Sequence, residues 1–595
     1  MRGLVLLFGV ASAALDGYKE FRKSYDLADA RFRESALGEK AREEYLKYLE
    51  TSFPFGSEYG SGQASEVAME YGDYIDEANK FIGRVDERTG LKKDILSDKF
   101  TEYINEKDPR VRPPVIRKNF YTLTEDEKSD FFFALKEMKR LNTTEGRDLY
   151  GEDFCNYEEL MLEHAKAALS KQCDKGHFGP AFFWFHRLYL LKVERSILAV
   201  TNTISSTLTG MPYWDSVMDL KRYGSYRKSP LFSDAYFGGE GNPDNGWAVE
   251  DGQFAGSDWE IQFSEDAELK NPYGLMRSPF NPNPSRRITR RFEAYCGFPW
   301  PEATEYAQDG CVKLHKGGIQ EFVACLDINL HANPHFNVGG TWDSEEGVQC
   351  LTLQVPAWML FVPPPGKEGG QQIAQFGQPG PAINQWSTGC IECPTDCTIG
   401  QDEPSDCFCY YKDRDDPFAA HQCLDGQVIS KNFPLYGLGV MGDMADVAFS
   451  TNDPIFWVHH ANVDRVLASW QVTNEDKAKQ YYFSPSVWPP DNGKLLLECD
   501  GHALDDIVND ESPFTGLFPS IPADQLLTVR DAIEQTVPGE SMPYEYDVLV
   551  GSAQAVYEAS IRAKEKAGVS VVPSKETSFD LGDLKKLFTK GMGGK

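Results

Sequence analysis

Six of the ten histidines in this chain fall into two clusters whose spacing is typical of metal sites. The first cluster holds His164, His177 and His186, and the second holds His331, His335 and His460. Neutral imidazole is a good copper ligand, and three imidazoles on one ion leave a position open for oxygen or substrate. Two such ions side by side can share the two electrons that O2 needs to become peroxide. The histidines therefore predict a pair of copper ions and an oxygen-handling protein.

The second cluster has the simpler local geometry. His331 and His335 are four residues apart, so on a helix they share one face and can hold the same ion. His460 would complete the site from a second helix. Its neighbour His459 cannot share the same helical face, so we interpret His459 as a residue that packs beside the ligands or supports them from behind.

The first cluster needs a loop as well as helices. His177 and His186 are nine residues apart, which places them on opposite sides of one helix. Gly176 and the Gly-Pro pair at 179–180 therefore predict that His177 precedes the helix in a loop, with Pro180 in the first helical turn. His164 is the histidine available upstream, on the apolar face of a helix predicted over 156–171.

Several segments around these histidines resemble the tyrosinase / catechol oxidase family of type-3 copper proteins. They are HFGPAFFWFHR (177–187), MPYWDS (211–216), HANPHFNVGG (331–340) and DPIFWVHHANVDR (453–465). RKNFYTLTEDEK (117–128) resembles the opening of the family's catalytic domain, and MPYEYDV (542–548) resembles the tyrosine motif that closes it. The resemblance spans about residues 110–550.

The resemblance implies the fold class and the chemistry. The fold would be mainly α, with a four-helix bundle around two copper ions, copper A held by the first cluster and copper B by the second. O2 and small phenols would be the partners. An o-diphenol would give up two electrons and leave as an o-quinone, and the metal would do the chemistry without a protein nucleophile.

The resemblance also assigns roles to residues next to the ligands. Arg187 and Asp464 would form a buried pair that couples the two copper-bearing helices and orients their ligands. The alternative for this pair is an ordinary surface ion pair. Phe182, one turn before His186, would pack between the two copper sites.

The chain departs from the family pattern beside the first copper-B histidine. Strong monophenolases often carry Asn directly after that histidine, and it holds a water together with an upstream Glu. Here Ala332 occupies the Asn position, and Asp327, four residues before His331, would supply the carboxylate. Because alanine cannot hold a water, Ala332 favours a diphenol oxidase, with Asn333 or a loop residue as a substitute anchor.

Two other function classes stay open at this level. A haemocyanin-like oxygen carrier uses the same copper pair, and substrate access distinguishes it from an oxidase. A copper-free structural protein is the third reading, and the six filled ligand positions argue against it.

The N-terminus and the composition indicate an extracellular protein. Residues 1–14 combine Arg2, an apolar run over 3–10 and the small residues 11–13, which together are typical of a secretory signal peptide. No later stretch reaches the length of a membrane span. The net charge of −31 disfavours nucleic acid as a partner. The sequence does not determine the oligomeric state.

The thirteen cysteines agree with an oxidising compartment. Six of them crowd into 34 residues: Cys390, Cys393, Cys397, Cys407, Cys409 and Cys423. This cluster predicts a disulfide-stapled insert, with zinc at the Cys390-x-x-Cys393 pair as the alternative. Some family members link a cysteine covalently to the second copper-A histidine. Because Cys173 is not in the usual place for that bond, a disulfide, with Cys155 as the candidate partner, is favoured over a thioether.

We predict four segments along the chain. The signal peptide over 1–14 is followed by a charged helical segment over 15–110. The dicopper catalytic domain covers 111–550 and includes the cysteine-rich insert within 341–452. A C-terminal helix and tail occupy 551–595.

Overall fold

The computed structural model describes residues 115–170, 174–177, 181–204, 206–292, 303, 306–314, 319–342, 391–402, 404–407, 410–411, 440–474, 501–551 and 553. The chain divides into two compact units, one of Met1–Val115 with Pro538–Lys595 and one of Ile116–Val537. The second unit contains all six predicted copper ligands. The predicted signal peptide, the helical segment over 15–110 and nearly all of the predicted C-terminal helix lie outside the described residues.

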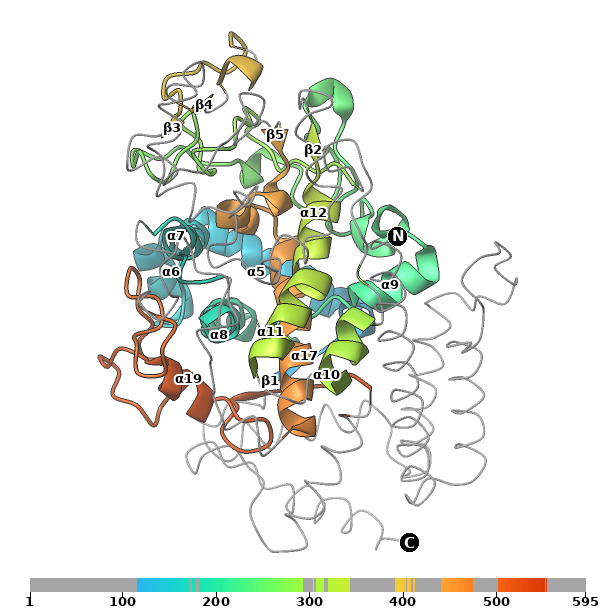
Figure 1. Cartoon of the computed structure of the whole chain (residues 1–595), viewed down its shortest axis with the longest axis vertical. Helices are drawn as coiled ribbons and strands as arrows, with labels where there is room; N and C mark the ends of the chain where they lie inside the picture. Colours follow the sequence, from blue (N-terminus) through green and yellow to red (C-terminus); the bar gives the residue numbers. More distant parts are fainter. Residues whose placement is uncertain are drawn as a thin grey trace, which may run out of the picture. The chain divides into compact units, whose positions relative to one another are not determined.

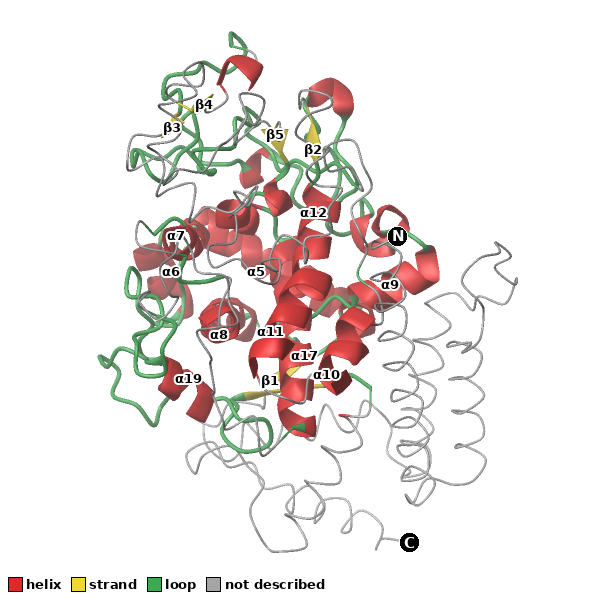
Figure 2. Ribbon diagram, viewed as in Figure 1, coloured by secondary structure: helices red, strands yellow, loops and turns green. Residues whose placement is uncertain are grey.

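The second unit is mainly α, as predicted (Figures 1 and 2). Its helices are α5 (Glu125–Arg140), α6 (Thr143–Tyr150), α7 (Tyr157–Ala168), α8 (Ala181–Thr203), α9 (Ser216–Tyr223), α10 (Cys311–Leu314), α11 (Ile319–Leu326), α12 (Asn333–Gly339), α17 (Ile455–Thr473) and α19 (Val529–Glu534). The strands are short. β2 (Thr341–Trp342) pairs antiparallel with β5 (Val440–Met441), and β3 (Ile391–Glu392) pairs antiparallel with β4 (Tyr410–Tyr411). β1 (Val115–Arg117) and β6 (Tyr544–Tyr546) complete the set of described strands.

Local sequence explains where the predicted helices begin. Thr124 caps α5 by accepting a hydrogen bond from the Glu127 backbone N–H, and the Glu127 carboxylate accepts one from the Thr124 backbone. Asn156 caps α7 with a single bond, its side chain accepting from the Glu159 backbone N–H. The helix predicted over 156–171 is therefore confirmed, within a few residues at each end.

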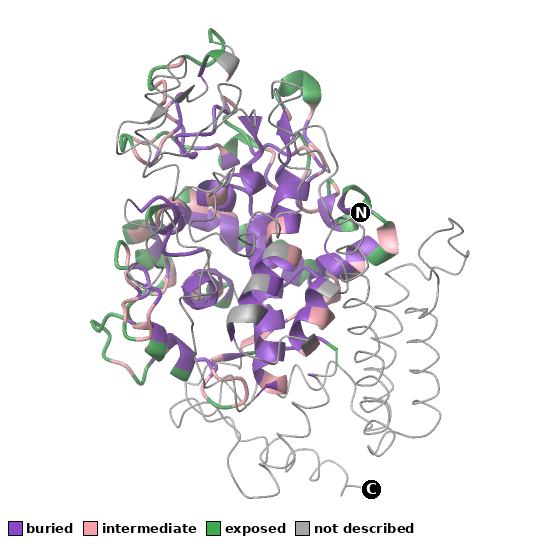
Figure 3. Ribbon diagram, viewed as in Figure 1, coloured by how far each residue is buried: buried purple, intermediate pink, exposed green. Residues whose placement is uncertain are grey.

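Two long helices form the centre of the copper-binding bundle. α8 packs against both α5 and α17, and α17 also packs against the segment that carries His331. Side chains are buried around nearly the full circumference of α8 and α17 (Figure 3). Helices that are buried on nearly all sides lie inside the protein, so these two helices are the rigid supports of the site.

The helix that carries the HxxxH pair is not a continuous α-helix. Between α11 and α12 the backbone of Asp327–Ala332 forms a π-helix, labelled η7. The simple α-helical geometry that we expected for His331 and His335 is therefore wrong for the first of them. π-helical turns are rare and occur mostly at functional sites, where the extra residue re-aims a side chain.

Glycines allow the loop after β5 to approach α12 closely. A Cβ on Gly339 would lie 2.2 Å from the Ala445 nitrogen, and one on Gly442 would lie 2.1 Å from the Gly339 oxygen. Gly340 ends the helix with a φ of +66°, a left-handed backbone that favours glycine. The Val-Gly-Gly end of the copper-B motif is thus explained by backbone contact.

Buried ion pairs hold the connection that leads into α17. Arg277 binds Asp443, and Arg290 binds Asp453, with the side chains of both pairs fully buried. Arg290 also donates to the carbonyls of Phe237 and Gly238. Each guanidinium therefore ties a loop of the long stretch between the two copper motifs to the residues just before α17.

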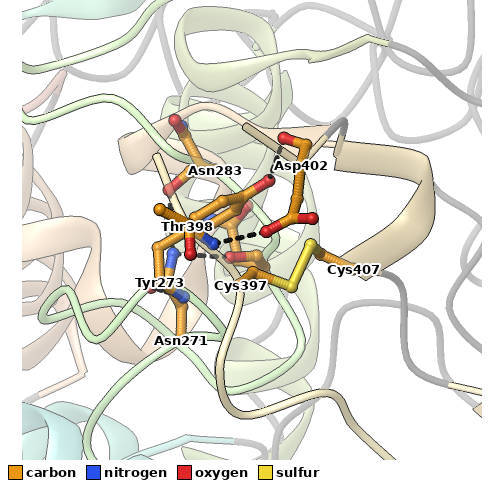
Figure 4. Close-up of a disulfide and its surroundings, with 8 residues drawn as sticks. Asn271, Tyr273, Asn283, Cys397, Thr398, Asp402 and Cys407 are labelled. Carbon is orange, nitrogen blue, oxygen red and sulfur yellow. Dashed lines mark hydrogen bonds between the residues drawn. A yellow bond between two sulfur atoms is a disulfide. The ribbon is translucent and has the colours of Figure 1, made fainter. Parts of the chain in front are cut away.

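The described cysteines confirm a disulfide-bonded insert. Cys397 and Cys407 form a disulfide, and Thr398 N–H donates to the Asp402 carboxylate inside the loop that the disulfide closes (Figure 4). Cys393 is also disulfide-bonded, which excludes it as a zinc ligand. A further disulfide joins Cys311 to Cys325.

The predicted disulfide between Cys155 and Cys173 is wrong, because the Cys155 thiol is free. Cys173 itself lies outside the described residues. The Cys155 backbone is held by both the N–H and the C=O bonding to the Ser196 hydroxyl, so the segment before α7 is fixed to α8 without a covalent link.

Within the described part of the chain, none of the helices has the length and hydropathy that crossing a bilayer requires.

Asp219 on α9 is a buried carboxyl whose ionisation is expected to limit stability. Its Oδ2 accepts hydrogen bonds from Trp214, Tyr121 and Ser229, yet burial dominates and raises the Asp219 pKa from 3.8 to about 7. The folded state therefore binds this proton more tightly than the unfolded state does. The resulting stability is present below pH 4 and is lost as the pH rises to 7.

Asp219→Asn is expected to reduce the decrease in the free energy of unfolding between pH 4 and 7. The effect is at most about 4 kcal/mol, because one pKa unit corresponds to about 1.4 kcal/mol. The measurement is urea unfolding of the native and variant proteins between pH 4 and 8. Asp244→Asn, at an exposed position, is the matched control and should leave the pH profile unchanged. Equal slopes for Asp219→Asn and the native protein would contradict the assignment.

Candidate metal centre

The three histidines predicted to hold copper A meet inside the bundle. His164 comes from α7, His186 from α8, and His177 from the loop of residues 174–177 between them. One ring nitrogen of each lies within 4.8 Å of one ring nitrogen of the other two. The Nε2 atoms of His164 and His186 are 3.4 Å apart. The expected arrangement, with His177 outside the helix, is what the structure shows.

The second cluster converges in the same way. His331 lies on η7, His335 on α12 and His460 on α17. The Nε2 atoms of His335 and His460 are 3.1 Å apart, and the buried His331 Nε2 has no hydrogen-bond partner. His459 also falls within the 4.8 Å group. Its Nε2, however, bonds to the His331 carbonyl at 3.0 Å, so His459 holds the backbone that carries a ligand.

Hydrogen bonds at the far side of three ligand rings set their tautomers. The Nδ1 atoms of three ligands lie against backbone carbonyls: His164 on Ala448, His186 on Phe182 and His335 on Met444, at 2.7–3.0 Å. A carbonyl only accepts hydrogen bonds, so each Nδ1 carries the proton and each Nε2 presents a lone pair to the centre.

This donor set fits copper. The Nε2 atoms of His335 and His460 face each other at 3.1 Å, close enough for one ion to accept a lone pair from both rings. Burial lowers the pKa of His164, His186, His335 and His460 well below 6.5, which keeps the rings neutral and able to coordinate. Neutral imidazole nitrogens in groups of three suit copper.

The two histidine clusters adjoin each other. His186 of the first stacks on His460 of the second, with ring centroids 4.5 Å apart. Phe182 lies 4.8 Å from His186 and 4.5 Å from His331, ring centre to ring centre. The phenylalanine therefore packs between the two sites, as the resemblance implied, and brings a ligand of each into contact with the same apolar surface.

A buried charge network joins the two central helices beneath the histidines. Arg187 on α8 binds Asp464 on α17 at 2.5 Å, and both side chains are at most 4% exposed. The alternative of a surface ion pair is thereby excluded. Arg117 binds the same aspartate at 3.1 Å and holds Glu194 on α8 at 2.9 Å. Arg187 directly follows His186, and Asp464 lies one helical turn after His460. The ion pair therefore orients both of the helices that carry these ligands.

Asp327 has a different contact from the one we anticipated. Its Oδ1 lies 2.8 Å from the His331 Nδ1, so this carboxylate orients a ligand ring. The Asn333 amide donates to the Asn329 carbonyl of its own helix. Ala332 lies beside both, half-buried and without a polar side chain. The neighbourhood of His331 thus supplies a carboxylate that is already bonded to a ligand.

Sequence reasoning missed three supports of the ligands. They are Asp174, which bonds to the His177 ring, Arg117, which shares Asp464, and the loop carbonyls of Met444 and Ala448. Asp174 could have been found from its place three residues before His177 in Asp-Lys-Gly-His. At that spacing a carboxylate can accept hydrogen bonds from the backbone N–H groups two and three residues later. The carbonyls carry no side-chain signal.

Comparison with known proteins relates the chain to one family. The model of the common central domain of tyrosinase matches residues 155–349 and 419–473. Tyrosinase of Streptomyces glaucescens is 30% identical over 233 residues, which cover 38% of this chain and 72% of that protein. Grixazone synthase of Streptomyces griseus is 33% identical over 168 residues, covering 27% of this chain and 48% of its own length. Among solved structures, tyrosinase from Burkholderia thailandensis aligns with a TM-score of 0.34 at 16% identity, over 75% of this chain and 77% of that one.

Proposed function

Because the chain belongs to the tyrosinase family of type-3 copper proteins, we propose that it is a secreted phenol oxidase that converts o-diphenols to o-quinones with O2. That the protein is a copper oxidoreductase with two copper ions as cofactor follows from the family together with the two histidine clusters. The observation that carries the proposal is the pair of adjoining imidazole triads, each with its ring nitrogens converged.

The bound coppers would supply the electron transfer between phenol and O2. The six histidines would hold the ions, and the residues bonded to their rings would orient them. Phe182, fully buried against His186 and His331, keeps an apolar surface beside a ligand of each cluster and excludes water there. All six ligand rings are buried, and His331 is the most exposed of them at 7%. A phenol is therefore proposed to approach past His331.

The preference for diphenols rests on Ala332 and Asp327. Ring hydroxylation of a monophenol needs the phenolate, and a phenol with a pKa near ~10 is almost wholly protonated at neutral pH. A base must then lie within hydrogen-bond reach of the docking oxygen. Asp327 bonds to the His331 ring, and Ala332 offers no polar atom to hold a water beside it. Oxidation of a diphenol needs no oxygen insertion into the ring.

Oxygen uptake by the copper-loaded protein with a monophenol and the matching o-diphenol, measured in parallel, tests this function. We expect turnover of the diphenol and slow or no turnover of the monophenol. Reversible oxygen binding without diphenol turnover would instead identify an oxygen carrier. Equal rates on the two substrates would contradict the inference from Ala332.

Ala332→Asn is expected to raise monophenol turnover relative to diphenol turnover by about 100-fold, the lower range of the contribution of a positioned proton acceptor. Ala332→Leu is the matched control, because leucine has the shape of asparagine without its polar atoms. It should leave the ratio of the two rates unchanged or lower it. An equal increase with both variants would show that side-chain size, and not water binding, governs the ratio.

Secretion is part of the proposal and is tested separately. The apolar run over 3–10 and the small residues 11–13 predict cleavage near residue 14. Expression of the full chain in a eukaryotic host should release a protein whose N-terminus begins close to residue 15. Retention of the intact N-terminus inside the cell would contradict it.

A further inference from the structure

We propose that Asp174 is the positioning residue of the copper-A loop ligand, and that it locks both the backbone and the imidazole ring of His177 into the geometry that copper requires. The inference rests on the dicopper site proposed above. It adds a residue that acts on the metal through His177.

The carboxylate of Asp174 bonds to both the backbone and the ring of His177. Its Oδ1 accepts hydrogen bonds from the backbone N–H of Gly176 at 2.9 Å and of His177 at 2.8 Å. The same carboxylate lies against the His177 Nδ1, at 3.0 Å through Oδ1 and 3.1 Å through Oδ2. The Nδ1 proton therefore points to Asp174, and the Nε2 lone pair points away from it, toward the cluster.

His177 needs such an anchor because it has no helix to hold it. His164 and His186 lie on α7 and α8, where the helical backbone sets the direction of the side chain, whereas residues 174–177 form a bend without regular hydrogen bonding. Fixing a flexible backbone and a ring costs conformational entropy that copper binding would otherwise have to offset. The three hydrogen bonds that the Asp174 carboxylate accepts offset this entropy loss before the ion binds.

Asp174 is itself held from outside the loop. The imidazole of His502 donates from Nε2 to the Asp174 carbonyl at 2.9 Å. The next residue, Lys175, donates its backbone N–H to Ala167 on α7 at 3.0 Å, and its ammonium pairs with Asp510. The backbone that carries the Asp174 carboxylate is thus fixed to the helix that carries His164 and to the 501–510 segment. Asp174, His177 and His502 are all buried, so the arrangement is rigid and shielded from solvent.

The copper-B site also has a carboxylate, Asp327, that bonds to the ring of a ligand. The Asp327 Oδ1 lies 2.8 Å from the His331 Nδ1. The ring centroids of His177 and His331 are 6.4 Å apart, with an angle of 25° between the ring planes. Each site thus has one imidazole backed by a carboxylate, which makes that ring a stronger donor to the metal. Asp174 differs from Asp327 in also holding the backbone of its ligand, because its carboxylate accepts hydrogen bonds from the N–H groups of Gly176 and His177.

Asp174→Ala and Asp174→Asn separate the two parts of this role. Alanine removes all the contacts, whereas asparagine keeps an oxygen for the two backbone N–H groups and removes the charge behind the ring. We expect about a 10- to 100-fold loss of affinity for one of the two coppers in the alanine variant, the usual effect of removing a ligand's hydrogen-bond partner. The asparagine variant should recover part of this affinity. Asp402→Ala, which removes a carboxylate that accepts from the Thr398 N–H inside the disulfide-closed loop, is the matched control and should bind both coppers normally (Figure 4).

The readouts are copper titration and electron paramagnetic resonance of the oxidised protein. A coupled Cu(II) pair is silent, whereas a single remaining Cu(II) gives a signal, so the alanine variant should become visible at limiting copper. Thermal unfolding of the copper-free proteins should change little. Two coppers bound with native affinity and a silent spectrum in Asp174→Ala would overturn the proposal. So would equal loss of both coppers together with a destabilised copper-free fold, because that result indicates a purely structural role. Failure of the native protein itself to bind two coppers would overturn the proposed function as well, which distinguishes the two failures.

Discussion

Replacing His335 with alanine is expected to abolish phenol oxidation while leaving the fold largely intact. His335 Nε2 lies 3.1 Å from that of His460, and its Nδ1 is fixed by the Met444 carbonyl, so the ring points into the centre of the second cluster. Without it, two imidazoles remain for copper B, which is too few to hold the ion in working geometry. We expect turnover to fall by more than about 100-fold, beyond the loss typical of residues that only support a ligand. Oxygen uptake with catechol and metal analysis measure both parts of the effect.

His459→Ala is the matched control for this change, because His459 is equally buried and belongs to the same group of four rings. Burial lowers its pKa to about 3, and its Nε2 bonds to the His331 carbonyl, so its loss should loosen one ligand and not remove one. We expect two coppers to stay bound and activity to fall less than in His335→Ala. If His459→Ala loses copper B while His460→Ala keeps it, the assignment of the adjacent pair is reversed.

Replacing Asp464 with alanine is expected to lower the free energy of unfolding by about 3–5 kcal/mol, the usual result of removing one partner of a buried ion pair. Asp464 binds Arg187 through one oxygen and Arg117 through the other, and neither guanidinium has any exposed surface. The variant leaves two buried positive charges without the carboxylate that they share. Urea unfolding at equilibrium, monitored by tryptophan fluorescence, gives the change directly.

Glu260→Ala provides the comparison for a surface pair. Glu260 binds Arg286, and the two side chains are 33% and 45% exposed. Exposed pairs contribute about 0–1 kcal/mol, so this variant should unfold close to the native protein. If Asp464→Ala were no more destabilised than Glu260→Ala, the network beneath the copper ligands would not hold α8 against α17.

Much of the site follows from local sequence, because short-range geometry needs no knowledge of the fold. The nine-residue interval from His177 to His186 excludes a shared helical face, and the structure places His177 in the predicted loop. The helices around His164 and His186 begin and end near the residues that apolar periodicity and capping indicate. Phe182 and the Arg187–Asp464 pair were accessible through the family motifs.

The hydrogen bonds behind the rings were not accessible, because they join residues far apart in the chain. The His164 ring rests on the Ala448 carbonyl, 284 residues away, and the His335 ring rests on the Met444 carbonyl, 109 residues away. Every residue presents the same backbone carbonyl, whatever its side chain, so no residue type marks these positions. The same reason explains the incorrect pairing of Cys155, since disulfide partners depend on which chain segments the fold brings together.

The sequence by itself determined which histidines can bind metal, that helices carry most of them, and that Ala332 leaves the position beside His331 without a polar group. Only the tertiary structure decided how the rings are aimed. The π-helical turn of η7 turns His331, Gly339 and Gly442 admit the loop that holds His335, and Asp174 holds His177. Ring orientation depends on contacts a few ångströms long between distant segments, and such contacts exist only after the helices have packed.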